Sequence, residues 1–417
     1  MIERTGVPAG TPPGARWRLV AGLAVTQTVS WGVLYYAFSV LLVPMQDDLG
    51  WSRSVLVGGF TTAVVISGLS APLVGRLLDA EVTRPLIVGG SVLGTAAVLG
   101  WSRVGSELAY YAMWAAIGLA MAAVLYEPAF TVLAKRTAPD HRRAITAVTL
   151  LAGLASFVFQ PFTSALTGQW GWRTALVVLA AVLAAVTVPI HVAVLGPVGR
   201  APARPARRAR ARPEETSDPR FWALTAAFVG VTTASLATGV LLIAYLVDHG
   251  WSLGRAAFAG GTLGAMQLPG RLAFGPLTSR LSRRVLVAGL FTVPGVGILT
   301  LLVAGGGRGV WAAVVVLGFG QGATTLLRAT LYVDLYGIER IGALNGWSGT
   351  PITCARALAP LAASLVVGWT GSYTVAFVGL VGCSVGAAAL AADVLGRAPA
   401  CPGGRARADV AAPDGRP

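Results

Sequence analysis

Long apolar runs alternate with short polar stretches along the whole chain. Twelve of these runs reach about 20 residues, the length that an α-helix needs to cross the hydrocarbon core of a membrane. They cover residues 18–43, 55–75, 85–102, 109–133, 144–168, 174–196, 221–246, 255–277, 285–304, 310–335, 343–367 and 373–395. The two-residue alternation of transmembrane strands is absent from the sequence. We therefore expect an all-α membrane protein with twelve transmembrane helices.

The basic residues divide unequally between the two sides of these spans. If the N-terminus is cytoplasmic, 24 of the 32 lie in inner segments, 5 lie in outer loops, and Arg271, Arg328 and Arg356 lie within spans. An excess of basic residues in cytoplasmic segments is the rule for multi-pass proteins. Almost all of them are arginines, which together with abundant alanine and glycine is typical of GC-rich bacterial coding. The sequence therefore predicts a bacterial inner-membrane protein with both termini in the cytoplasm.

The composition narrows the class of protein further. Only 12% of the 417 residues are charged and the mean hydropathy is +0.70, whereas soluble domains are about 25% charged. These values exclude a soluble enzyme, a disordered protein and a coiled coil. The net charge of +15 is concentrated on the inner side, above all in the arginine-rich stretch 200–212. We expect that stretch to be a linker that contacts anionic lipid headgroups, and we expect no nucleic acid partner.

The two halves of the chain repeat each other at an offset of 200 residues. Asp48-Leu49-Gly50-Trp51-Ser52 recurs as Asp248-His249-Gly250-Trp251-Ser252. The same offset, without gaps, pairs Gly75 with Gly275, Arg84 with Arg284, Gly118 with Gly318 and Gly171 with Gly371. Because one repeat holds six spans, the halves are parallel six-helix units, as in many transporters. We expect a six-helix bundle over 1–196, a cytoplasmic linker rich in Arg and Pro over 197–220, a second bundle over 221–396, and a disordered cytoplasmic tail over 397–417.

The loop after the second span carries a recognisable motif. It begins Gly75-Arg76-Leu77-Leu78-Asp79 and continues to a basic residue at Arg84, which resembles the signature of the major facilitator superfamily. The resemblance implies the major facilitator fold and a cytoplasmic gate. In that gate the glycine allows close helix packing, and Arg76, Asp79 and Arg84 form a charge relay.

A finer resemblance rests on the Asp-x-Gly-Trp-Ser-Arg start of the second span, the segment Gln267 to Arg271 in the eighth and the arginine in the eleventh. These look like the monocarboxylate-porter and oxalate/formate-exchanger branch of the superfamily. The resemblance implies that Arg271 meets a substrate carboxylate and that Arg356 assists. Gln267 stands where some members carry an aspartate.

Charges inside the spans mark candidate functional residues, because charge within a membrane is costly. Glu127, in the fourth span, is the one clearly deep carboxylate against the three intramembrane arginines. This imbalance predicts an electropositive cavity suited to an anion, which arginine can hold through two parallel hydrogen bonds. Two interpretations of Arg328 remain open: it contacts the substrate, or it pairs with Glu127. Glu127 is also the candidate proton carrier.

Gln27, Trp31 and Tyr35 recur at intervals of four on the first span and so share one helix face. The first span lines the cavity in the fold that the resemblance implies, so these three are candidate substrate contacts. Tyr36 lies beside this face, and for it we favour interhelical packing.

Motifs for other kinds of chemistry are missing from the sequence. We find no Walker A motif, no dinucleotide loop, no zinc motif and no nucleophile elbow. We therefore expect no enzyme activity, no cofactor and no bound metal.

The sequence as a whole predicts a secondary active transporter that moves a small organic anion, most like a monocarboxylate, by alternating access. Its partners would be that anion, protons or a counter-solute, and membrane lipids, and we expect a monomer. Two alternatives remain: a multidrug or other solute efflux permease of the same fold, and a membrane sensor that binds a ligand without transporting it.

Overall fold

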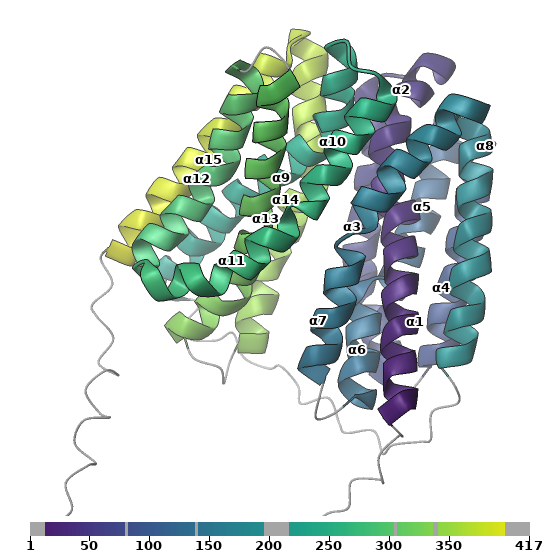
Figure 1. Ribbon diagram of the computed structural model, residues 1–417, viewed down its shortest axis with the longest axis horizontal. Helices are drawn as coiled ribbons and strands as arrows, with labels where there is room; N and C mark the ends of the chain where they lie inside the picture. Colours follow the sequence, from purple (N-terminus) through teal and green to yellow (C-terminus); the bar gives the residue numbers. More distant parts are fainter. Residues whose placement is uncertain are drawn as a thin grey trace, which may run out of the picture.

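The computed structural model describes residues 13–79, 82–137, 141–195, 217–303, 307–336 and 341–396, and every regular element in those residues is a helix. This confirms the expected all-α class. Figure 1 shows two groups of helices side by side, α1 to α8 in one and α9 to α15 in the other. We call them the first and second bundle. The expected linker and tail fall mostly on residues 196–216 and 397–417, outside the described residues.

The helix bounds follow the apolar runs closely. The first bundle contains α1 (Pro13–Trp31), the π-helical turn η1 (Gly32–Tyr36), α2 (Ala37–Leu49), α3 (Arg53–Asp79), α4 (Thr83–Trp101), α5 (Glu107–Val124), α6 (Tyr126–Arg136), α7 (His141–Ala152) and α8 (Ala155–Val194). The second bundle contains α9 (Pro219–Asp248), α10 (Leu253–Ala265), α11 (Gln267–Arg280), α12 (Arg283–Val303), α13 (Gly307–Tyr336), α14 (Ile341–Thr370) and α15 (Tyr373–Gly396).

Ten helices in the described residues are long and apolar enough to cross a membrane, against twelve expected spans. The expected spans 144–168 and 174–196 run together in the structure, because only a kink at Gly171 (φ 77°, ψ 163°) interrupts α8. The expected span 255–277 is divided instead into α10 and α11, which meet at Met266 and are each too short to count. These two local features account for the difference between ten and twelve.

The repeat in the sequence is also a repeat in the backbone. Four glycines of the described residues have positive φ: Gly50 (65°), Gly250 (85°), Gly171 (77°) and Gly371 (64°). They form two pairs at the 200-residue offset. Glycine is the residue that adopts this conformation without steric cost. The chain therefore needs a positive φ at the same point of each bundle, once after α2 and α9 and once before the last span.

Helix packing repeats at the same offset. A Cβ on Gly118 in α5 would lie 2.9 Å from the Cα of Ala63 in α3, and one on Gly318 in α13 would lie 3.2 Å from the carbonyl carbon of Leu263 in α10. Ala63 and Leu263 are themselves 200 residues apart. Small residues let helices approach closely in lipid, and here the same crossing is made once in each bundle.

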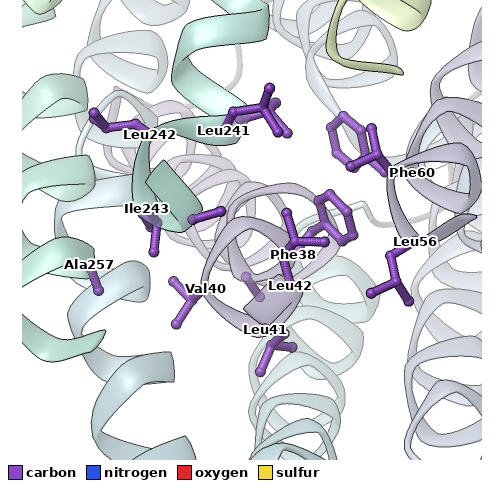
Figure 2. Close-up of a cluster of buried hydrophobic side chains, with 14 of the residues drawn as sticks. Phe38, Val40, Leu41, Leu42, Leu56, Phe60, Leu241, Leu242, Ile243 and Ala257 are labelled. Carbon is purple, nitrogen blue, oxygen red and sulfur yellow. The ribbon is translucent and has the colours of Figure 1, made fainter. Parts of the chain in front are cut away.

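The apolar core joins the bundles at one end of the molecule and separates at the other. We call the end where α1 begins and α15 ends the terminal face, and the other end the opposite face. Towards the opposite face, one cluster of buried side chains runs across both bundles. Figure 2 shows part of it, with Val40 of α2 near Ile243 of α9, and Phe38 of α2 beside Phe60 of α3. Towards the terminal face, the buried side chains divide into separate clusters in each bundle. The bundles are therefore closed against each other at the opposite face.

Candidate functional site

Two broken helices, one in each bundle, carry most of the candidate site residues. The backbone leaves the helical conformation at Leu125 (φ −77°, ψ −159°) between α5 and α6, and a turn at Met266 separates α10 from α11. In each case a proline, Pro128 or Pro269, comes three residues later. Proline lacks the N–H that would bond to the carbonyl four residues before it, so it weakens the helix at that point. Discontinuous helices commonly form the binding sites of transporters.

Arg271 lies one turn into α11 and reaches towards the first bundle. Its Nη2 donates to the Oε1 of Gln267 at 3.4 Å, and its Nη1 donates to the carbonyl of Thr149 in α7, also at 3.4 Å. The Nε2 of Gln267 in turn donates to the Oε1 of Gln321 in α13 at 3.2 Å. Both arginine contacts are long, and the buried Nε has no partner in the described part of the chain. The guanidinium therefore keeps donor capacity for a solute.

Arg328 and Arg356 form the other cationic part of the candidate site. Arg328 is half-buried in α13 and Arg356 is exposed in α14, and the two guanidinium groups are close enough to interact electrostatically. Within the described ranges, neither they nor Arg271 form an ion pair with a carboxylate. Three cations without a carboxylate partner leave a local excess of positive charge, which an anion would neutralise.

Aromatic side chains from the first bundle face these arginines. The η1 turn of α1 bonds Ala37 N–H to the carbonyl of Gly32, one residue further back than in an α-helix. This extra residue rotates the following side chains, and such turns are frequent at functional sites. The ring of Trp31 lies 5.3 Å from Tyr35, 6.3 Å from Tyr36 and 4.9 Å from Tyr126, between ring centres. Tyr36 interacts electrostatically with both Arg271 and Arg356.

The structure brings several of the predicted substrate contacts together. Arg271 meets Gln267, Arg356 lies in electrostatic range of Tyr35 and Arg328, and Trp31 packs on Tyr35. Tyr36, for which we favoured packing, packs on Trp31 and Tyr35, and the π-helical turn also brings it within electrostatic range of Arg271 and Arg356.

Two predicted residues lie elsewhere. Gln27 is completely buried in helix packing. Glu127, expected to be deep, is exposed in the first turn of α6 and has no ion pair with Arg328 or any other described residue. The break at Leu125 moves its side chain off the face that a continuous fourth span would give it.

Tyr126 is a site residue that the sequence pattern did not single out. It comes directly after the break at Leu125, stacks on Phe130 at 5.0 Å between ring centres, and interacts electrostatically with Arg271. The signal that could have identified it is Pro128, two residues later, because a proline inside a predicted span indicates a break and an altered helix face.

The arrangement suits binding of a small anion better than bond-making chemistry. Within the described ranges, no three histidine, cysteine or acidic side chains lie close enough to hold a metal ion. The side chains that converge are arginines, amides and aromatic rings, which bind and orient a solute.

Comparison with known proteins identifies the family. The family model of the Major Facilitator Superfamily matches residues 23–360. The chain belongs to the Major Facilitator Superfamily. It is therefore a multi-pass membrane transporter of small molecules rather than an enzyme, as the sequence indicated.

Relatives within the superfamily carry more specific names. An oxalate:formate antiporter of Oxalobacter formigenes is 28% identical over 252 residues, 58% of this chain and 58% of that protein. Monocarboxylate transporter 13 of Rattus norvegicus is 24% identical over 412 residues, 91% of this chain and 88% of that one. An MFS-type efflux pump of Mycolicibacterium smegmatis is 28% identical over 282 residues, 65% of this chain and 64% of that one. The chain thus spans less than two thirds of the length of the antiporter and of the efflux pump.

A solved structure supports the superfamily fold. A bacterial homologue of the human lysosomal transporter Spinster, in an inward-facing and occupied conformation, aligns with a TM-score of 0.69. It is 14% identical, and the alignment covers 93% of this chain and 95% of that one. At this identity the likeness shows the fold alone.

The superfamily signature lies at the end of α3, on the terminal face. Arg76 is exposed, Arg84 is half-buried at the start of α4, and Asp79 is the last residue of α3. We expected Gly75 to pack closely on a neighbouring helix, but no described atom lies within 4 Å of where its Cβ would be. The bundle cores are separate towards this face. For that reason no helix among the described residues packs closely on Gly75.

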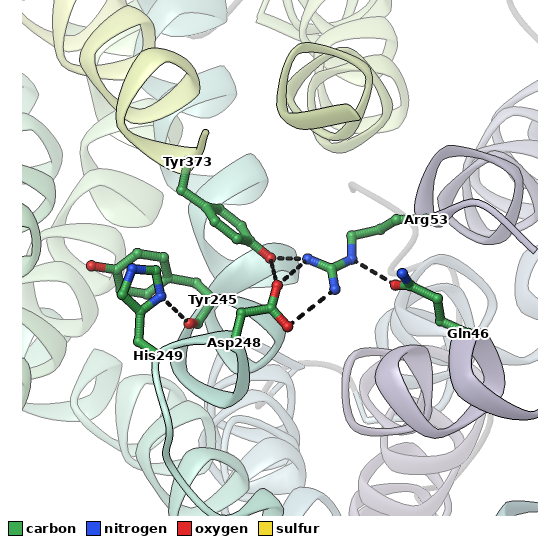
Figure 3. A network of polar contacts seen from close by, with 6 residues as sticks. All are labelled: Gln46, Arg53, Tyr245, Asp248, His249 and Tyr373. Carbon is green, nitrogen blue, oxygen red and sulfur yellow. Dashed lines mark hydrogen bonds and ion pairs between the residues drawn. The ribbon is translucent and has the colours of Figure 1, made fainter. Parts of the chain in front are cut away.

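A polar network joins the two bundles of this superfamily member at the opposite face (Figure 3). Arg53, at the start of α3, donates from Nη1 to the Oδ2 of Asp248 at 2.8 Å and also contacts the hydroxyl of Tyr373. The Nε of Arg53 donates to Gln46 at 3.0 Å, and the Tyr373 hydroxyl donates to Asp248 at 2.8 Å. Arg53 belongs to the first bundle and Asp248 and Tyr373 to the second, so the network holds this face closed.

Proposed function

We propose that the protein is a secondary active transporter of a small organic anion, most like a monocarboxylate. The observation that carries the proposal is the group of three intramembrane arginines, Arg271, Arg328 and Arg356, which have no carboxylate partner among the described residues. An unpaired charge within a membrane is costly, so its presence indicates that function requires it. The names of two relatives, an oxalate:formate antiporter and a monocarboxylate transporter, support the same solute class.

Arg271 is the first solute contact in this proposal. Its guanidinium has spare donors and stands opposite Tyr36 and Tyr126 of the other bundle. A carboxylate bound there is held from both bundles at once, with Arg356 supplying the second cation and the aromatic rings enclosing the rest of the solute. Gln267 orients the arginine, and Trp31 and Tyr35 complete the aromatic wall.

Alternating access moves the solute in this proposal. The terminal face, where the bundle cores are separate, is the cytoplasmic side of a bacterial inner membrane, because the basic residues gather there. The opposite face is then the outer side, closed by the network around Arg53 and Asp248. Transport requires that this network opens while Arg76, Asp79 and Arg84 close the terminal face. Protons or a counter-solute drive the cycle, and Glu127 is the candidate proton carrier. The protein acts as a monomer.

An efflux permease of the same fold is the second candidate. The observation in its favour is the similarity to an MFS-type efflux pump over 65% of the chain. The arginine group argues against an apolar cation as the solute, because like charges repel.

Uptake into proteoliposomes tests the proposal. The purified protein is assayed with labelled mono- and dicarboxylates and with lipophilic cations, each with and without a pH gradient. Saturable uptake of at least one carboxylate is expected. Transport of the cations and of no carboxylate would favour the efflux permease, and binding without any flux would favour a sensor.

A further inference from the structure

At the break between α5 and α6, the backbone carbonyl of Val124 lacks the partner that it would have in a continuous helix. In a continuous helix the carbonyl of Val124 would accept from the N–H of residue 128, but that residue is a proline and has none. Val124 is almost fully buried, and Leu125 beside it has an extended backbone. A buried carbonyl without a hydrogen bond is costly, so another group has to satisfy it.

Gln27 supplies that hydrogen bond from a different helix. Its Nε2 donates to the carbonyl of Val124 at 2.6 Å, from α1 to the end of α5. Gln27 is 0% exposed at this crossing. It therefore does not reach a solute in this conformation.

Tyr126, the residue just after the break, belongs to the candidate site. Tyr126 comes two residues after Val124, packs on Trp31 and lies in electrostatic range of Arg271. Glu127 comes next and begins the exposed side of α6. The backbone angle at Leu125 fixes the direction in which both side chains point, so a group that fixes this angle also fixes them.

We infer that Gln27 is a positioning residue of the transport site. By holding the Val124 carbonyl it keeps the fourth span broken at Leu125, and the break presents the ring of Tyr126 to the solute beside Trp31 and Arg271. The transport part of this inference rests on the proposed function. The local part, that Gln27 holds the break, does not depend on any solute.

A double-substitution cycle in proteoliposomes tests the transport part. Gln27→Met keeps the side-chain length and removes the donor, and it is expected to lower the ratio of maximal rate to KM for a carboxylate by about tenfold. In a Tyr126→Ala background the same change is expected to cost less than about twofold, because residues that act as one unit are not additive. Multiplicative effects would overturn the inference, as would full activity of Gln27→Met.

Two further variants keep the test decisive if Gln27→Met folds poorly. Gln27→Glu can donate to the Val124 carbonyl only when protonated, so its activity relative to wild type at the same pH is expected to recover as the pH falls. Thr26→Val is the matched control, because Thr26 is equally buried in the preceding position, and its hydroxyl donates to the carbonyl of Leu23 within α1. A pH-independent defect in Gln27→Glu, or an equal defect in Thr26→Val, would contradict the positioning role.

Hydrogen–deuterium exchange of the purified protein separates this inference from the proposed function. Without Gln27 the break loses its restraint, so amides of residues 126–132 are expected to exchange at least about tenfold faster in Gln27→Met than in wild type. Thr26→Val should leave them unchanged. If no carboxylate is transported but exchange accelerates, the proposed function fails and Gln27 still holds the break. If exchange is unchanged, the inference itself is wrong.

Discussion

Arg53 and Asp248 form an ion pair that links the two bundles, with 2.8 Å between Nη1 and Oδ2. The residue equivalent to Asp248 in the repeat is Asp48, and it pairs with Arg173 of its own bundle at 3.2 Å. Arg173 is in turn equivalent to Tyr373, the other partner of Asp248. The two aspartates therefore bind residues at equivalent positions of the repeat. Among the described residues, Asp248 also contacts the other bundle and Asp48 does not.

Asp248→Asn is expected to weaken closure of the opposite face, since it removes the charge that Arg53 holds. A partly exposed ion pair contributes about 1 kcal/mol, or about a fivefold change in the open population. The measurement is the rate at which a thiol reagent labels a cysteine in place of Val40, which is buried between the bundles. Serines first replace the native cysteines, Cys354, Cys383 and Cys401.

Asp48→Asn provides the matched control, because it breaks an ion pair inside one bundle and should leave labelling at position 40 unchanged. The charge exchange Arg53→Asp with Asp248→Arg should restore the slow rate. Equal acceleration by both asparagine variants would show that the pair between the bundles has no special part in closure.

Arg328→Gln is expected to stabilise the solute-free protein while weakening solute binding. Arg328 and Arg356 repel each other in the absence of an anion. Removing one charge should raise the Tm by about 2 °C and lower carboxylate affinity by about tenfold. Thermal unfolding in detergent, with and without a carboxylate, measures both effects. Arg308 is exposed at the start of the same helix, so Arg308→Gln should change neither the Tm nor the carboxylate affinity. A lower Tm with unchanged affinity would make Arg328 a purely structural residue.

Glu127→Gln separates proton coupling from solute movement. If Glu127 carries the proton, the amide variant should still exchange solute for solute but should lose the stimulation of uptake by a pH gradient. Counterflow and gradient-driven uptake in the same proteoliposomes measure the two activities. Glu107→Gln, an exposed carboxylate in the first turn of α5, is the control. Stimulation that persists in Glu127→Gln would place the proton carrier elsewhere.

The span pattern and the repeat could be predicted from the sequence because both depend on local rules. Apolar length determines where helices cross a membrane, and the Gly50 and Gly250 turns require a residue that accepts positive φ. The kink at Gly171 could not be predicted in the same way, because apolar length alone does not show whether two neighbouring runs join across a glycine.

The candidate site could be predicted only in part. The sequence pattern assigns side chains to the faces of continuous helices, but the helices that carry the site are interrupted. The arginines were found by their cost in a membrane, which does not depend on helix geometry. The helix-face pattern does not show that the π-helical turn brings Tyr36 towards the arginines, or that Gln27 donates to the carbonyl freed by Pro128. The repeat indicates where the two halves differ: Pro128 is equivalent to Arg328, so the sequences of the halves diverge at the candidate site.

Uptake by the Arg271→Ala variant tests the central claim most directly. Wild type, Arg271→Ala and the control Arg280→Ala, exposed at the end of the same helix, are reconstituted side by side and assayed for initial uptake of a labelled monocarboxylate. Anion transport through the arginine group predicts saturable uptake in wild type and the control, and a rate at least about tenfold lower in Arg271→Ala. Uptake by Arg271→Ala at the wild-type rate would contradict it.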